Sequence, residues 1–233
     1  MTGNLWWLAL SLAVFVGGHF LISSTRLRPL LVGAVGDFPY MGLFSLFAGA
    51  SFVWVLWAYH DAPYVALWLP PLWTQHVLLA LMVPATFLAV VGYTTPSASA
   101  VGGDATAKRA DPAPGIQKIT RHPFLWGVAL WAGGHLCVNS DAASLIFFAA
   151  FLLFALAGTV TIDCKRRARM GADWDRYDQR TSNVPFRAIA EGRAPLPGLA
   201  EIGWWRLALA IAVYALVLWG HGPVIGIDPL MSL

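Results

Sequence analysis

Residues 115–127 read Gly-Ile-Gln-Lys-Ile-Thr-Arg-His-Pro-Phe-Leu-Trp-Gly, and within them a segment with basic side chains is followed by an apolar sequence typical of membrane helices. The apolar run continues to Gly133-Gly134-His135, so His122 stands at its entry and His135 lies deep inside it. A second Gly-Gly-His, residues 17–19, lies inside the first apolar segment of the chain. Ionisable residues within a membrane are costly, so we interpret the two deep histidines as candidates for a functional site.

The composition is that of an integral membrane protein. Of 233 residues, 58% are hydrophobic and 12% are charged, and the mean hydropathy is +0.64, whereas soluble domains carry about 25% charged residues. We therefore expect the lipid bilayer to be the main partner. A formal charge of +3 gives no reason to expect a nucleic-acid partner. Cys137 and Cys164 lack metal-type spacing and are interpreted as reduced packing residues.

Six stretches are candidates for crossing the membrane, which takes about 20 apolar residues per helix. They are residues 5–22, 41–59, 74–92, 124–138, 142–162 and 204–219, the fourth being short. Only Asn139-Ser140-Asp141 separates the fourth from the fifth, which predicts a tight helical hairpin. We predict an all-α integral membrane protein with six transmembrane helices in a single transmembrane domain, residues 1–233.

The basic residues predict the orientation. The loops 23–40, 93–123 and 163–203 carry two, four and eight Lys or Arg, which is fourteen of the fifteen in the chain. The alternate segments 1–4, 60–73, 139–141 and 220–233 carry none. The positive-inside rule makes the basic loops cytoplasmic and both termini periplasmic. No signal-peptide or transit-peptide pattern precedes the first span, so we expect a multi-pass protein of the bacterial inner membrane.

Composition also predicts one loop. Residues 97–114 are rich in Ser, Ala, Gly, Pro and Asp. Such segments lack the apolar periodicity of a helix or strand and usually connect packed elements. We therefore predict a flexible cytoplasmic loop between the third and fourth spans.

His19 and His135 are predicted to lie toward the middle of the bilayer. At 1.5 Å per residue, His19 is roughly 20 Å from the periplasmic start of its helix, and His135 roughly 16 Å from the cytoplasmic start of its own. Two glycines before each histidine would let a neighbouring helix, or a flat ligand, approach closely. A haem with an imidazole on each face suits this arrangement. Helix packing alone, with each histidine bonded to a backbone carbonyl, explains the same spacing.

Haem propionates would need cationic partners near the cytoplasmic face. Arg26, Arg28 and Arg121 are placed for this by sequence, with His122 beside them. Ordinary positive-inside flanking explains the arginines equally well. Pro123 fits the first turn of a helix and so has a purely structural explanation.

Three stretches resemble the NnrU membrane protein family, which includes the 15-cis-zeta-carotene isomerases. They are residues 115–141, Gly18-His19-Phe20 followed by Ser23, Ser24 and Arg26, and the later residues 163–166, Gly171 and 180–186. The resemblance implies a haem b (protohaem IX) ligated by His19 and His135. It further implies either haem-dependent cis-trans isomerisation of a hydrophobic small molecule or a role in denitrification and nitric oxide metabolism.

Two other classes of function stay open. Arg121-His122-Pro123-Phe124 and residues 173–177 are similar to the isoprenylcysteine carboxyl methyltransferases, which implies S-adenosylmethionine as co-substrate. The glutamate of that family's later motif is absent, and Asp163 is the nearest acid. The third class is a non-catalytic partner of denitrification enzymes. The sequence also leaves homo-oligomer formation open.

Overall fold

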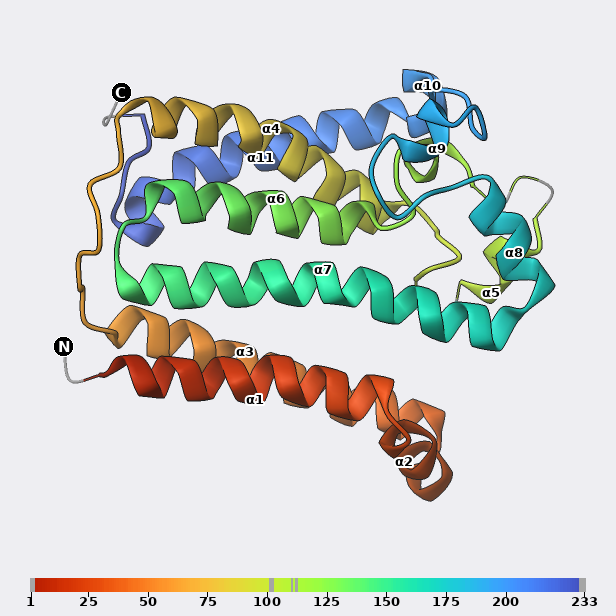
Figure 1. The fold of residues 1–233 in the computed structure, drawn as a ribbon, viewed down its shortest axis with the longest axis horizontal. Helices are drawn as coiled ribbons and strands as arrows, with labels where there is room; N and C mark the ends of the chain where they lie inside the picture. Colours follow the sequence, from red (N-terminus) through yellow and green to blue (C-terminus); the bar gives the residue numbers. More distant parts are fainter. Residues whose placement is uncertain (1–2, 101–102, 110, 112, 231–233) are drawn as a thin grey trace. The chain divides into compact units, whose positions relative to one another are not determined.

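The fold is helical throughout the described part of the chain (Figure 1). The computed structural model describes residues 3–100, 103–109, 111 and 113–230, so the outermost residues of both predicted periplasmic termini lie outside it. Within these ranges the only β-type pairing is an isolated bridge between Ala66 and Asp141. The predicted all-α class is confirmed.

A helix occurs at each of the six predicted positions. These helices are α1 (Leu5–Ser24), α3 (Asp37–Asp61), α4 (Trp73–Thr94), α6 (Pro123–Val138), α7 (Ala142–Met170) and α11 (Trp204–Ile225). Five helices of the described residues are long and apolar enough to cross a membrane, whereas α6, with 16 residues, is shorter. Three residues separate α6 from α7, as the predicted hairpin requires. The count of six spans and the periplasmic termini stay predictions.

Several helices extend beyond their predicted bounds, and α7 does so furthest. The helix α7 continues past residue 162 through the basic run to Met170, because Lys and Arg are good helix formers and are stabilised by the negative end of the helix dipole. A helix, α2 (Leu27–Val35), also forms where a loop was predicted. It ends at Gly36, whose φ of 88° is readily adopted only by glycine, and α3 starts at the next residue.

The chain contacts divide into two compact units. The first unit is Met1–Pro70 with Asn139–Phe154, and the second is Pro71–Val138 with Ala155–Leu233. The single transmembrane domain over residues 1–233 stays a prediction. The long helix α7 contributes its first part to one unit and its second part to the other.

The first unit is held together by aromatic rings. Phe15 of α1 is 7% exposed, and its ring centroid lies 5.5–5.7 Å from those of Phe52, Phe151 and Phe154. A Cβ at Gly18 would overlap the ring of Phe47, so this glycine lets α1 approach α3 closely. Burial of large aromatic side chains is among the strongest sources of packing energy, and here it fastens α1 to α3 and α7.

The second unit is built around the contact between α4 and α6, with α11 packed along α4 (Figure 1). A Cβ at Gly127 would lie 2.7 Å from the carbonyl oxygen of Ala85. A Cβ at Gly134 would lie 2.8 Å from a methyl group of Leu78. Small residues at both places therefore allow close approach of the two helices, as is typical of helix pairs in membranes.

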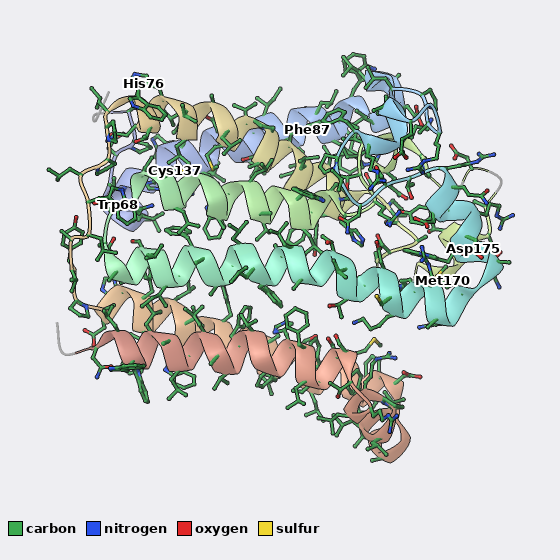
Figure 2. All side chains as sticks on the ribbon, viewed as in Figure 1. Trp68, His76, Phe87, Cys137, Met170 and Asp175 are labelled. Atoms are coloured by element: carbon green, nitrogen blue, oxygen red, sulfur yellow. The ribbon has the colours of Figure 1, made fainter. Side chains whose placement is uncertain are left out.

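Polar atoms gather at the end of the second unit that contains Met170 and Asp175 (Figure 2). This end consists of five short elements: α5 (Asp104–Ala107), the 3₁₀ turn η1 (Gly115–Lys118), α8 (Ala172–Gln179), α9 (Arg187–Ala190) and α10 (Leu199–Ile202). A flexible loop was predicted over 97–114, but its described residues include the helix α5 and buried side chains. Residues 101–102, 110 and 112 of this segment are not among the described residues. Three alanines of this segment are packed against aromatic rings. Ala98, Ala107 and Ala113 lie with Trp174 and Tyr177 in one buried cluster.

The α4–α6 contact generates a stability prediction. Gly127→Ala places a methyl group against the backbone of α4, and overpacking of this kind costs roughly 1–3 kcal/mol. The matched control is Gly220→Ala in α11, where no heavy atom of the described residues lies within 4 Å of the added Cβ. We expect Gly127→Ala to lower the thermal unfolding temperature in detergent, followed by circular dichroism, and Gly220→Ala to leave it unchanged or raise it. Equal midpoints for both variants would contradict the packing described.

Candidate functional site

The entry to α6 is bonded to carboxylates on two other helices. Arg121 donates from Nε and Nη2 to Asp163 of α7, at 3.0 Å and 2.7 Å to Oδ2. Its Nη1 donates to Asp178 of α8. The imidazole Nε2 of His122 lies 2.6 Å from Oδ1 of Asp163. We call Arg121, His122, Asp163 and Asp178 the entry cluster.

The entry cluster is largely shielded from solvent. Arg121 and His122 are 8% and 4% exposed. Burial disfavours a charged guanidinium, but the hydrogen bonds and charge of Asp163 and the charge of Asp178 outweigh this effect, so the pKa of Arg121 is raised. The arginine is therefore a permanent cation matched by two carboxylates.

A buried polar layer supports the entry cluster. The guanidinium carbon of Arg121 lies 5.7 Å from the ring centroid of Trp174. Tyr177 is fully buried and donates from its hydroxyl to Oε1 of Gln117 at 2.9 Å. Burial raises the pKa of Tyr177 to about 12, so its phenol is a neutral donor at physiological pH. The Trp174 ring is therefore a third partner of the Arg121 guanidinium, beside the carboxylates of Asp163 and Asp178.

The segment 180–186 wraps around the entry to α6. The amide of Arg121 donates to the carbonyl of Ser182 at 2.9 Å. The hydroxyl of Thr120 and the indole of Trp126 both donate to the carbonyl of Asn183, at 2.6 Å and 2.8 Å. The two stretches that resembled one family by sequence, 115–127 and 180–186, therefore bind each other.

Sequence reasoning found Arg121 and His122 but missed the function of Asp163 and Asp178. A usable signal was present, because Asp163 is the only acidic residue in the 29 residues of α7. An acid at the end of such an apolar helix needs a cationic partner. Arg167, four residues after Asp163 on α7, donates to Asp178 at 2.6 Å.

His19 lies in an aromatic environment in the first unit. Its ring centroid is 4.7 Å from that of Phe15 and 5.2 Å from those of Phe44 and Phe154. Its Nδ1 lies 3.0 Å from the carbonyl oxygen of Phe15. Because a carbonyl only accepts, Nδ1 carries the proton, and in the neutral ring the lone pair is at Nε2.

His135 repeats this local arrangement in the second unit. Its Nδ1 lies 2.8 Å from the carbonyl oxygen of Trp131, four residues earlier on α6. The second glycine of each Gly-Gly-His motif, Gly18 or Gly134, faces a neighbouring helix closely. The first glycine, Gly17 or Gly133, has no heavy atom of the described residues within 4 Å of its Cβ position. The two motifs therefore share a tautomer and a pattern of one packed and one open glycine.

The remaining predicted propionate partners, Arg26 and Arg28, lie at the start of α2. Arg26 is exposed at the start of α2, and the guanidinium carbon of Arg28 lies 5.5 Å from the ring centroid of Tyr40. Cys137 and Cys164 are free, as predicted, but both are exposed. Among the described residues, no group of three or more His, Cys, Asp or Glu could hold a metal ion.

Several apolar helices and a polar, ion-paired end define the class of multi-pass helical membrane proteins. A family model described as "NnrU protein" matches residues 7–229, so the chain belongs to the NnrU family.

Two curated relatives match part of the chain. It is 34% identical over 83 residues to the chloroplastic 15-cis-zeta-carotene isomerase of Arabidopsis thaliana. It is 31% identical over 83 residues to the enzyme of the same description from Zea mays. Each match covers 36% of this chain and 23% of the relative, so the chain spans less than a quarter of each relative's length. No solved structure matches the chain.

The entry cluster predicts a large difference between two Asp→Asn substitutions. Asp163→Asn removes a charge that compensates the buried Arg121, and breaking a buried ion pair costs roughly 3–5 kcal/mol. Asp173→Asn breaks only the surface pair with Arg176, worth under about 1 kcal/mol. We expect Asp163→Asn alone to lower the unfolding midpoint in a detergent–denaturant titration and to accelerate tryptic cleavage within 165–193. If the two variants behave alike, the entry cluster does not hold this end of the molecule together.

Proposed function

We propose that this protein spans a bacterial inner membrane six times and holds a haem b (protohaem IX) between His19 and His135. The shared local geometry of the two Gly-Gly-His motifs carries this proposal. Membership of the NnrU family and the partial match to 15-cis-zeta-carotene isomerases support it. The distribution of basic residues supports the orientation, with both termini in the periplasm.

The donor chemistry of the two histidines fits an axial ligand. A histidine that ligates a metal usually donates its other ring N–H to a carbonyl or carboxylate, which fixes the tautomer and orients the ring. His19 and His135 each make such a bond to the carbonyl four residues earlier. The chain thus keeps Nε2 as the basic nitrogen without the help of a further side chain.

The surroundings of the histidines fit a flat, apolar group. Phe15, Phe44 and Phe154 give the His19 ring an apolar, aromatic environment, and a low local dielectric strengthens interactions with a bound ion. Gly17 and Gly133 present no side chain on the helix surface close to each histidine. These features would allow a macrocycle to lie against the helix backbone.

Arg26 and Arg28 remain the proposed partners of the haem propionates. Arg121 and His122 were predicted to share this role, but both side chains are engaged by Asp163. We propose that they act on the cofactor indirectly, by fixing the start of the helix that carries His135. An arginine already matched by two carboxylates has little positive potential left for a third anion.

Bound haem supplies a one-electron redox centre and, when a ligand position opens, a Lewis acid. This chemistry supports two activities for the chain: cis-trans isomerisation of a hydrophobic polyene, or a redox response to nitric oxide. The geometry favours the methyltransferase alternative less, because Arg121 and His122, two of the residues that suggested it, are bonded to Asp178 and Asp163. A non-catalytic role beside denitrification enzymes is compatible with the same haem.

Haem content tests the proposal. After expression with ample haem, the purified protein should show a Soret band and sharp visible bands on reduction with dithionite. His19→Ala and His135→Ala should each lower haem per protein several-fold, because each removes one of the two side chains that would hold the iron.

His76→Ala is the matched control for both substitutions. His76 lies on α4 and also directs Nδ1 toward the carbonyl four residues earlier, but at 3.4 Å and in an exposed position. The His76→Ala variant should bind as much haem as the unmodified protein does. Absence of a Soret band, or full haem content in the His19 and His135 variants, would contradict the proposed function.

A further inference from the structure

A cavity of about 300 Å³ lies where the start of α1 meets the end of α3, within the first unit. It is lined by Gly3, Asn4, Trp7, Trp57, Ala58 and Asp61. Its volume is at the lower end of the range for small-ligand sites, roughly 300–1,000 Å³. None of these residues takes part in the proposed haem site or in the entry cluster.

Two tryptophans give the cavity aromatic walls. Trp57 is 65% exposed and Trp7 is 45% exposed, so both rings are accessible to a ligand. The Trp7 ring is positioned by an edge-on contact with Trp54, with centroids 5.1 Å apart. The side chain of Asn4 also caps the amide of Trp7 at 2.8 Å. Tryptophan has the most favourable ring face for a cation among the aromatic residues.

Asp61 gives the same cavity a negative charge. It is the last residue of α3, where the helix dipole is already negative and an acidic side chain is unfavourable. Trp57 lies one turn earlier, so its ring and the Asp61 carboxylate share a helix face. A carboxylate has about four lone-pair sites, so Asp61 can accept bonds from its own chain and from a ligand together.

We propose that this cavity binds an alkylammonium group, with Trp7 and Trp57 against the cation and Asp61 as its counter-ion. In the proposed topology the cavity opens at the periplasmic interface of the membrane. An alkylammonium group reaches that interface either on a zwitterionic phospholipid or on a dissolved amine. The proposal depends on the topology for its source of ligand and is independent of haem.

Choline chloride is the probe for the dissolved source. Saturation-transfer NMR on the full chain in maltoside micelles should detect transfer from protein to the N-methyl protons of choline. Trp57→Leu and Asp61→Asn should each weaken binding about five- to tenfold, and Trp57→Phe, which keeps a ring, should weaken it less. Trp57 is exposed and Asp61 is partly exposed, and unchanged circular dichroism would show that each variant is folded.

The controls use the same residue types elsewhere in the first unit. Asp37→Asn removes the acid at the opposite end of α3, and Trp68→Leu removes another partly exposed tryptophan outside the cavity. Both should bind choline as the unmodified protein does. A choline signal of equal strength in Asp61→Asn and Asp37→Asn would exclude a dissolved amine as the ligand.

Native mass spectrometry tests the lipid source. Protein transferred from nanodiscs that contain equal amounts of phosphatidylethanolamine and phosphatidylglycerol should retain the former preferentially, and Asp61→Asn should abolish the preference. Lipid retention that depends on Asp61 supports a phospholipid ligand, and choline binding alone supports a dissolved amine. If neither probe binds in an Asp61-dependent way, the inference is wrong, whether or not the protein contains haem.

Discussion

A buried arginine must be matched by negative charge, and the bond between Arg121 and Asp163 satisfies this constraint. The two residues are far apart in sequence, at the entry to α6 and near the end of α7. Leaving either charge alone in a low-dielectric environment would cost several kcal/mol. The pair therefore determines which residues of the polar end can come together, and Asp178, His122 and the segment 180–186 are arranged around it.

The entry cluster has a consequence for the proposed haem. It fixes the first turn of α6, and His135 lies three turns further along the same helix. Gly127 and Gly134 allow α6 to pack closely against α4, and this contact further restricts the position of the His135 backbone. A metal ligand must be held to within a fraction of an ångström. Residues that never touch the cofactor can therefore determine whether it binds.

Sequence periodicity and charge found the six apolar segments because the cost of exposing charge to lipid acts on each segment separately. The same reasoning failed for residues 23–40 and 97–114, where α2 and α5 formed. Connecting segments outside the apolar helices are free of that constraint, and their structure depends on contacts with other parts of the chain. The alanines of 97–114 pack on Trp174 and Tyr177, which lie in a later part of the chain.

The sequence by itself determined the all-helical class, the positions of the apolar helices and the presence of a histidine in two of them, His19 in α1 and His135 in α6. These follow from local chemistry, since a helix satisfies its own backbone hydrogen bonds in lipid and an isolated imidazole there needs a partner. Only the tertiary structure decided that Arg121 and His122 are bonded to Asp163, and that Trp7, Trp57 and Asp61 share one cavity. Such contacts join residues dozens of positions apart, and no single helix period encodes them.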